Sequence, residues 1–256
     1  MAGLLILSRG RHRDLRKEHR PDLIRARLEQ PRGESPLGHF VLGGVDGVVT
    51  TFAVVAGSVG GRLSTTTIVI LGLANLIADG FSMAASNYLA TSSRSHEVAR
   101  ARADEDWQVE TFPEGERTEI REIFARKGLK AEMLDQVVDI VTSDRKVWVD
   151  TMMAEELKLS EIAVQPMKAA LVTFAAFAVF GFFPLLPFLL GDAHFSRAFE
   201  TSIGFAAAAF FTLGLAKGSL LGLPPLRAGW QTLAIGGLAA ALAYTTGLGL
   251  RALLGG

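Results

Sequence analysis

A single carboxylate stands in the first strongly apolar stretch of the chain. Asp46 lies within LGGVDGVVTTFAVVAG, residues 42–57, where nearly every other residue is small or apolar. Placing an ionised carboxylate inside a bilayer costs roughly 3 kcal/mol or more, and such residues are functional by default. Small residues four apart, such as Gly43 and Gly47, favour close packing of helices. We therefore expect Asp46 to face protein or a water-filled cavity instead of lipid.

The next apolar stretch carries polar side chains at every fourth position. Asn75, Asp79, Met83 and Asn87 form one slanted face if this stretch is a helix. Carboxylate and amide oxygens suit hard divalent cations, and the thioether of a methionine shifts the preference toward Fe²⁺ or Mn²⁺. The residues predicted to line a transport path are Asp46, Asp79, Met83 and Asn87.

A structural interpretation of the same face stays open. Met83 is then a filler of the helix core and Asn75 bonds a neighbouring helix. Asp79 then lies near the outer end of a tilted helix, or carries protons alone.

A polar insert of about 70 residues, 94–166, has more acidic side chains than solubility requires. Glu116 and Glu119 share one helix face, and Glu105 lies in the helix before it. The stretch WVDTMMAEEL places Met152, Met153 and Glu156 on neighbouring faces of a later helix. The pattern predicts a metal-binding site, and the alternative is an ordinary solvated acidic face.

The apolar stretches define the fold class. The chain has 256 residues, 49% of them hydrophobic, and five segments are long and apolar enough to span a membrane. These lie at about 39–60, 66–92, 168–190, 201–223 and 228–250. We predict an all-α polytopic membrane protein with four parts: an arm (1–38), two spans (39–93), the insert (94–166) and three more spans (167–256).

The insert is expected to contain three helices. Residues 95–110 have no Pro or Gly, and Thr111 with Pro113 and Glu114 resembles a capping box for a helix over 114–127. Gly128 is expected to end that helix, and a third helix is expected over about 130–159. The arm mixes leucines such as Leu15 and Leu28 with arginines, which predicts either an amphipathic helix on the inner leaflet or a disordered tail.

The distribution of Lys and Arg predicts the orientation. The basic arm, the insert, Lys217 and Arg227 fall on one side, which the positive-inside rule makes cytoplasmic. Lys217 is expected to reach the inner interface from the fourth span. The chain has no cysteine, so disulfides and thiolate metal sites are excluded. Its Arg-, Ala-, Gly- and Leu-rich composition indicates a bacterium, and hence the plasma (inner) membrane.

Four stretches together resemble the vacuolar iron transporter family: DGVVTTFAVVAG, ADGFSMAASNYLA, PEGERTEIREIFARKG and DRKVWVDTMMAEEL. The resemblance covers about residues 36–250 and implies five membrane helices, a helical cytoplasmic metal-binding domain and a homodimer. It also implies export of Fe²⁺, and often Mn²⁺, from the cytoplasm in exchange for protons.

The resemblance assigns roles to particular residues. Asp46 and Met83 would line a path between the first helices of two subunits. The implied insert ligands are Glu105, Glu116, Glu119, Met152, Met153 and Glu156. Two positions depart from the pattern, because Asn87 and Gln108 stand where carboxylates are expected. These departures predict weaker metal binding or proton coupling.

The sequence thus predicts a transporter, not an enzyme, that moves Fe²⁺, Mn²⁺ or related divalent transition metals. The expected partners are these ions, protons, the lipid bilayer and a second copy of the chain, with no nucleic acid and no permanently bound cofactor. One rival is a membrane-anchored metal-binding or ferroxidase module, although the insert lacks the Glu-x-x-His pairs of di-iron bundles and has only His96. The other rival is a scaffolding membrane protein.

Overall fold

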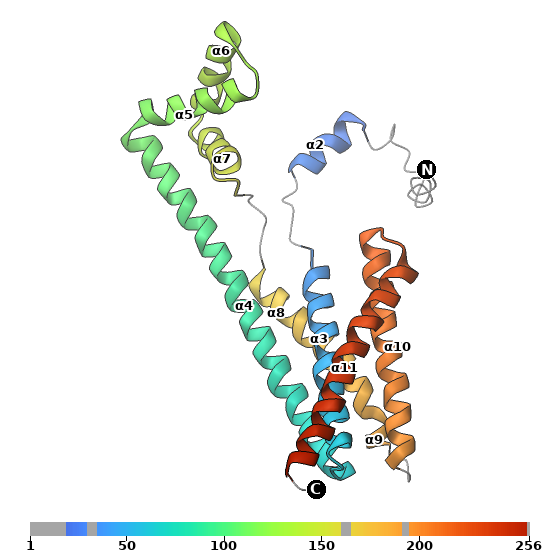
Figure 1. The fold of residues 1–256 in the computed structure, drawn as a ribbon. Helices are drawn as coiled ribbons and strands as arrows, with labels where there is room; N and C mark the ends of the chain where they lie inside the picture. Colours follow the sequence, from blue (N-terminus) through green and yellow to red (C-terminus); the bar gives the residue numbers. More distant parts are fainter. Residues whose placement is uncertain (1–18, 30–34, 160–164, 191–194, 255–256) are drawn as a thin grey trace. The chain divides into compact units, whose positions relative to one another are not determined.

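The computed structural model describes residues 19–29, 35–159, 165–190 and 195–254. Regular structure within these ranges is entirely helical (Figure 1). The helices are α2 (Pro21–Glu29), α3 (Leu37–Gly60), α4 (Thr65–Thr111), α5 (Pro113–Arg126), α6 (Ala131–Thr142), α7 (Arg145–Glu155), α8 (Pro166–Phe182), α9 (Leu186–Leu189), α10 (Phe195–Leu221) and α11 (Pro225–Leu254). A 3₁₀ turn, η1 (Phe183–Leu185), joins α8 to α9.

Five helical segments are long and apolar enough to cross a membrane, which confirms the predicted spans. The third consists of α8, η1 and α9, because the α-helix gives way to a 3₁₀ turn at Pro184 and resumes at Leu186. The chain therefore belongs to the polytopic all-α membrane proteins, as its hydropathy pattern predicts.

The chain divides into two compact units. The first, here the membrane unit, contains Ser35–Leu89 and the helices α8 to α11. The second, here the insert unit, contains α4 from Ala90 onward together with α5, α6 and α7. Helix α4 contributes to both, because it continues without interruption from Thr65 to Thr111.

Helix α3 is the centre of the membrane unit. It packs on α8, α10 and α11 (Figure 1), and its glycines remove the side chains that would hold these helices apart. A Cβ at Gly43 or Gly47 would collide with the backbone carbonyl of Thr173 or Phe177 on α8. On another side, a Cβ at Gly60 would lie 3.0 Å from the carbonyl oxygen of Tyr244 on α11. The packing is therefore between backbones and leaves little freedom to shift.

The insert unit has its own apolar core. Ile120 and Val138 are fully buried at its centre, from α5 and α6. Trp148, Met152 and Met153 join them from α7. The amphipathic stripe of α6, with Leu134, Val138 and Val141 buried, supplies one wall of this core.

The structure corrects two predictions in the insert. Thr111 is the last residue of α4 and not a cap, and Phe112 at the N-cap of α5 makes no side-chain capping bond. The predicted helix 130–159 is two helices, because Asp144 starts α7 by accepting a hydrogen bond from the amide of Val147 at 3.1 Å. Gly128 lies beyond the end of α5 with φ +98°, as predicted.

The predicted arm is described only from His19 to Glu29, where α2 forms. Leu15 lies outside the described residues, and so do the side chains of Arg27 and Leu28.

Candidate functional site

Asp46 lies on the half-buried face of α3 beside its glycines. Gly43 and Gly47 face α8, and a Cβ at Gly44 would meet Leu213 of α10 at 2.7 Å, so the glycines around Asp46 bring neighbouring helices close to α3. Its side chain lines a cavity of about 320 Å³, here the Asp46 cavity, as do Lys217 of α10 and Thr232 of α11. The remaining lining is apolar: Val41, Leu42, Val45, Val49, Leu213 and Ile235. The carboxylate thus borders a space formed by α3, α10 and α11, and its avoidance of lipid stays a prediction.

The polar face of α4 meets α3 and α8 at Asn87. Its amide Nδ2 donates a hydrogen bond to Oγ1 of Thr173 at 2.7 Å and lies 2.9 Å from Nδ1 of His39. Along α4, Met83 lies about one turn and Asp79 about two turns before Asn87, and along α3, Asp46 lies about two turns after His39.

Asp79 is also the other acidic group whose charge acts on Asp46. Asp46, Asp79 and Met83 belong to two helices of one unit, and their role in a common path stays a prediction. Asn75, one turn further along, has a buried Nδ2 with no hydrogen-bond partner among the described residues. The fully buried hydroxyl of Thr51 is likewise unpaired within the described chain.

Four carboxylates of the insert unit form a second acidic cluster, here the insert carboxylates: Glu105 of α4, Glu116 and Glu119 of α5, and Glu156 at the end of α7. Glu105 and Glu116 are only 4% and 5% exposed, and each has a buried Oε2 without a hydrogen-bond partner in the described residues. None of the four forms an ion pair with a described Lys, Arg or His. A buried, unpaired carboxylate is costly, so the cluster is an unsatisfied site for positive charge.

The pKa values of the insert carboxylates respond to this crowding. Burial, followed by repulsion from Glu156 and Glu116, raises the pKa of Glu105 to about 7. Burial and repulsion from Glu119 raise the pKa of Glu116 to about 6. Burial also raises the pKa of Glu156, which shares a hydrogen bond with Glu119. Near neutral pH the cluster therefore holds protons that a bound cation would displace.

Ion pairs surround this cluster and fix the helices that carry it. Arg145 of α7 bonds both Asp106 (2.7 Å) and Glu110 (2.9 Å) on α4. Arg102 of α4 bonds Asp150 of α7 at 2.5 Å. These pairs hold α4 against α7 on either side of Glu105, and they do not include any of the insert carboxylates.

Met152 and Met153 lie differently from the glutamates. Both are almost completely buried, at 0% and 1% exposure, among the apolar side chains of the insert core. Gln108, at the predicted departure, is half-buried on α4. Among the described residues no three His, Cys, Asp or Glu side chains are arranged so that they could hold a metal ion. The proposed ligand set therefore stays a prediction, and the described geometry supports the gathering of the carboxylates.

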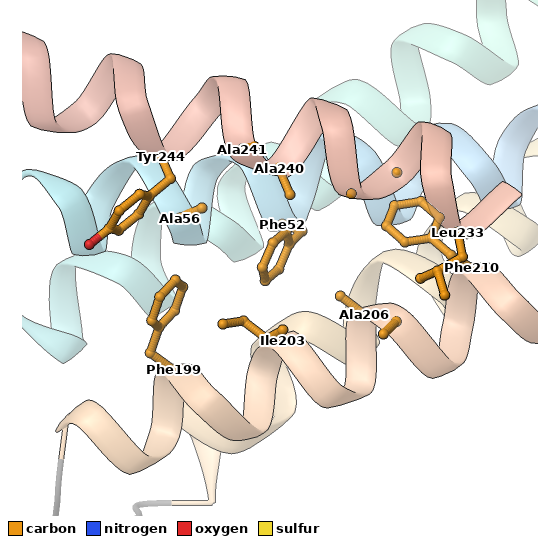
Figure 2. A pocket seen from close by; sticks show the side chains of 13 residues that line it. Phe52, Ala56, Phe199, Ile203, Ala206, Phe210, Leu233, Ala240, Ala241 and Tyr244 are labelled. Atoms are coloured by element: carbon orange, nitrogen blue, oxygen red, sulfur yellow. The ribbon is translucent and has the colours of Figure 1, made fainter. Parts of the chain in front are cut away.

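A second cavity in the membrane unit offers no ion ligands. It measures about 400 Å³ and is lined by apolar side chains of α3, α10 and α11. Figure 2 shows Phe52, Phe199 and Tyr244 bordering it, and the rings of Phe199 and Tyr244 stack with centroids 5.9 Å apart. The contrast singles out the Asp46 cavity as the one with charged lining.

Sequence reasoning missed two features of the site. One is that Lys217 lines the Asp46 cavity, while its reach to the inner interface stays a prediction. The contact of His39 with Asn87 was not expected, since nothing in the local sequence links two residues 48 positions apart. The sequence signal for the position of Lys217 was a lysine inside an apolar span.

Comparison with known proteins assigns the chain to a family. The family model described as the VIT family matches residues 37–248. A protein of Toxoplasma gondii named vacuolar iron transporter is 36% identical over 84% of this chain and 74% of its own length. Vacuolar iron transporter 1 of Arabidopsis thaliana is 32% identical over 80% of this chain and 82% of its own. Vacuolar iron transporter 2 of rice (Oryza sativa subsp. japonica) is 33% identical over 80% and 83%. With its five membrane helices and a match over most of its length, this chain belongs to the VIT family.

Proposed function

We propose that this protein transports divalent transition metal ions, Fe²⁺ and Mn²⁺ foremost, out of the cytoplasm across a membrane in exchange for protons. The observation that carries the proposal is Asp46, a carboxylate at a cavity within a bundle of five membrane helices. The names of the relatives support iron as an ion that is moved.

The insert carboxylates collect the ion in this mechanism. Glu105 and Glu116 are buried, mutually repelling and unpaired, so a dication that enters the cluster neutralises charge and displaces protons. The orientation rule places this unit in the cytoplasm, where the ion is captured.

Inside the membrane, Asp46 and Met83 replace part of the hydration shell of the ion, with Asp79 at the next level of α4. A proton arriving from the opposite side competes for the carboxylate of Asp46 and releases the ion, because a neutral carboxyl group no longer attracts a dication. Two copies of the chain are expected to enclose the path as a homodimer.

The test is flux into proteoliposomes with an imposed pH gradient, using a panel of Fe²⁺, Mn²⁺, Mg²⁺ and Ca²⁺. Wild-type protein is expected to move Fe²⁺ or Mn²⁺ in response to the gradient, and Asp46→Asn is expected to stop that flux. Asp22→Asn is a matched control, since Asp22 is exposed on α2 and pairs with Arg20. Equal flux in wild-type and Asp46→Asn liposomes would remove Asp46 from the mechanism, and iron oxidation without flux would favour the ferroxidase alternative.

A further inference from the structure

Lys217 is the one cationic side chain that lines the Asp46 cavity. It is half-buried on α10, one turn before the end of that helix at Leu221. Asp46 and Lys217 border the same space of about 320 Å³. Their charged atoms are nevertheless further apart than the 4.0 Å limit of an ion pair, and within the described part of the chain Lys217 pairs with no other carboxylate.

The surroundings give this arrangement a physical meaning. The rest of the lining, apart from Thr232, is apolar, and the hydroxyl of Thr232 donates a hydrogen bond to the carbonyl of Ala228 in its own helix. Asp79 adds a second negative charge that acts on Asp46, and Lys217 as it lies in this structure does not offset it. Unless a cation comes closer, the two carboxylates leave net negative charge in a medium of low dielectric constant, which is unfavourable.

We propose that Lys217 is a tethered counter-cation for Asp46, and that the transported dication must displace it. This inference rests on the proposed function. The ammonium group sits on a flexible four-carbon stem with three donors, so it can approach the carboxylate when the path is empty and retreat when an ion arrives. Lys217 therefore competes with incoming cations for the carboxylate of Asp46, and this competition determines which ions can bind there.

Two consequences follow for the ion. A tethered positive charge near the site weakens the binding of every cation, which keeps the ion from being trapped and favours its release. It also favours dications over monovalent ions, because a single positive charge gains no more from Asp46 than Lys217 already supplies. Lys217 is therefore a positioning and specificity-determining residue for the site at Asp46.

The first experiment measures the concentration dependence of Mn²⁺ flux into proteoliposomes for wild type, Lys217→Met, Lys217→Arg and Lys168→Met. Lys168 is an exposed residue of α8 that does not line the cavity, so Lys168→Met is the matched control for the loss of one positive charge. Lys217→Met is expected to lower the KM for Mn²⁺ about tenfold or more and to lower kcat as release slows. It is also expected to make Mn²⁺ flux sensitive to Na⁺. Lys217→Arg keeps the charge and should keep the wild-type KM and resistance to Na⁺.

An unchanged KM in Lys217→Met, or an equal change in Lys168→Met, would overturn the inference. The split between KM and kcat matters because a merely structural role would lower the amount of active protein without improving affinity. Absence of flux in the wild type would instead count against the proposed function.

The second experiment does not depend on transport. It measures the thermal stability in detergent, with a chelator present, of wild type, Asp46→Asn, Lys217→Met and the double variant. If the two charges compensate each other, Lys217→Met alone lowers the Tm, and the double variant recovers most of that loss. Strictly additive effects of the two substitutions would overturn the pairing, even if flux is normal.

Discussion

Asp46 and the insert carboxylates are the same kind of group in opposite surroundings. Asp46 borders a cavity that it shares with a lysine, on a helix fixed by glycine contacts to neighbouring backbones. The insert carboxylates crowd together without a cation, on helices held by Arg–Asp pairs such as Arg145 with Asp106. A lysine near a carboxylate opposes the binding of a dication, whereas crowded carboxylates without a cation favour it. Under the proposed function, the insert would capture ions and the membrane unit would let them pass.

The largest expected effect distinguishes the two regions by whether a substitution changes the maximal flux or the KM. Asp46→Asn should lower Mn²⁺ flux at every concentration by about 100-fold or more, since it removes the charge that compensates the ion inside the bilayer. Glu116→Gln should leave the maximal flux nearly unchanged and raise the KM by about tenfold or less, because capture is slowed only when the metal is scarce. Both are measured in proteoliposomes, with Glu132→Gln on the exposed face of α6 as the control. A loss of maximal flux in Glu116→Gln would erase the distinction.

The next prediction concerns the backbone contact that holds α3 against α8. Gly47→Leu forces a side chain into the backbone of Phe177, where no flexible group can give way, and should destabilise the protein by about 3 kcal/mol or abolish folding. Gly38→Leu is the matched control, because a Cβ there meets nothing within 4 Å. Thermal inactivation in detergent distinguishes the two variants. Equal stability would mean that α3 and α8 are not in backbone contact.

The pH dependence of metal binding should come from the insert. Since the pKa of Glu105 is raised to about 7, its contribution to stability in the metal-free protein is fully present below the ordinary value of 4.5 and is lost as the pH rises through about 7. Metal binding needs the charged form, so the affinity should rise with pH and fall by about tenfold per pH unit below 6 for each proton displaced. Titration calorimetry in buffers with different ionisation enthalpies counts these protons.

Glu105→Gln supplies the control for that titration. It removes the repelling charge, so the variant should unfold a few degrees higher than wild type at pH 8 without metal and bind fewer ions. A metal affinity of the wild type that does not change between pH 5.5 and 7.5 would contradict the raised pKa values of the insert carboxylates.

The smallest expected effect comes from the ion pairs of the insert. Arg145→Met removes the partner of Asp106 and Glu110, which are half or more exposed, so the loss should be about 1 kcal/mol. It should shrink further at high salt. Arg126→Met, at an exposed end of α5, should be neutral. Chemical denaturation monitored through Trp148, buried in the same core, measures both variants. A loss that does not depend on salt would mean that Arg145 acts through packing.

The extent to which the sequence predicts this molecule depends on the range of the interactions involved. The five spans follow from local hydropathy, and the turn at Gly128 follows from a glycine that adopts φ +98° at no steric cost. The break before Asp144 was missed although the sequence signals it, because residues 142–146 interrupt the apolar positions and Asp144 is a common helix cap. The spacing of Asp79 and Met83 correctly places them on one face.

What the sequence could not predict depends on contacts across the fold. Lys217 reaches the Asp46 cavity only because α10 packs beside α3. The burial of Met152 and Met153 follows from α7 turning that face to α5 and α6, and no periodicity of the acidic residues indicates it. Likewise, Glu105 and Glu116 come together only when α5 folds back at Phe112.

The glycine contacts of α3 constrain how this protein can move. Where two backbones touch, no layer of side chains can re-pack, so α3 and α8 must travel as one block. The glycines of α4 lie against side chains and not against backbone. Gly72 faces the side chain of Leu185, and Gly80 faces the rings of Phe174 and Phe177. At these positions α4 can shift through changes of side-chain rotamer, whereas α3 and α8 cannot slide past each other without a collision of their backbones.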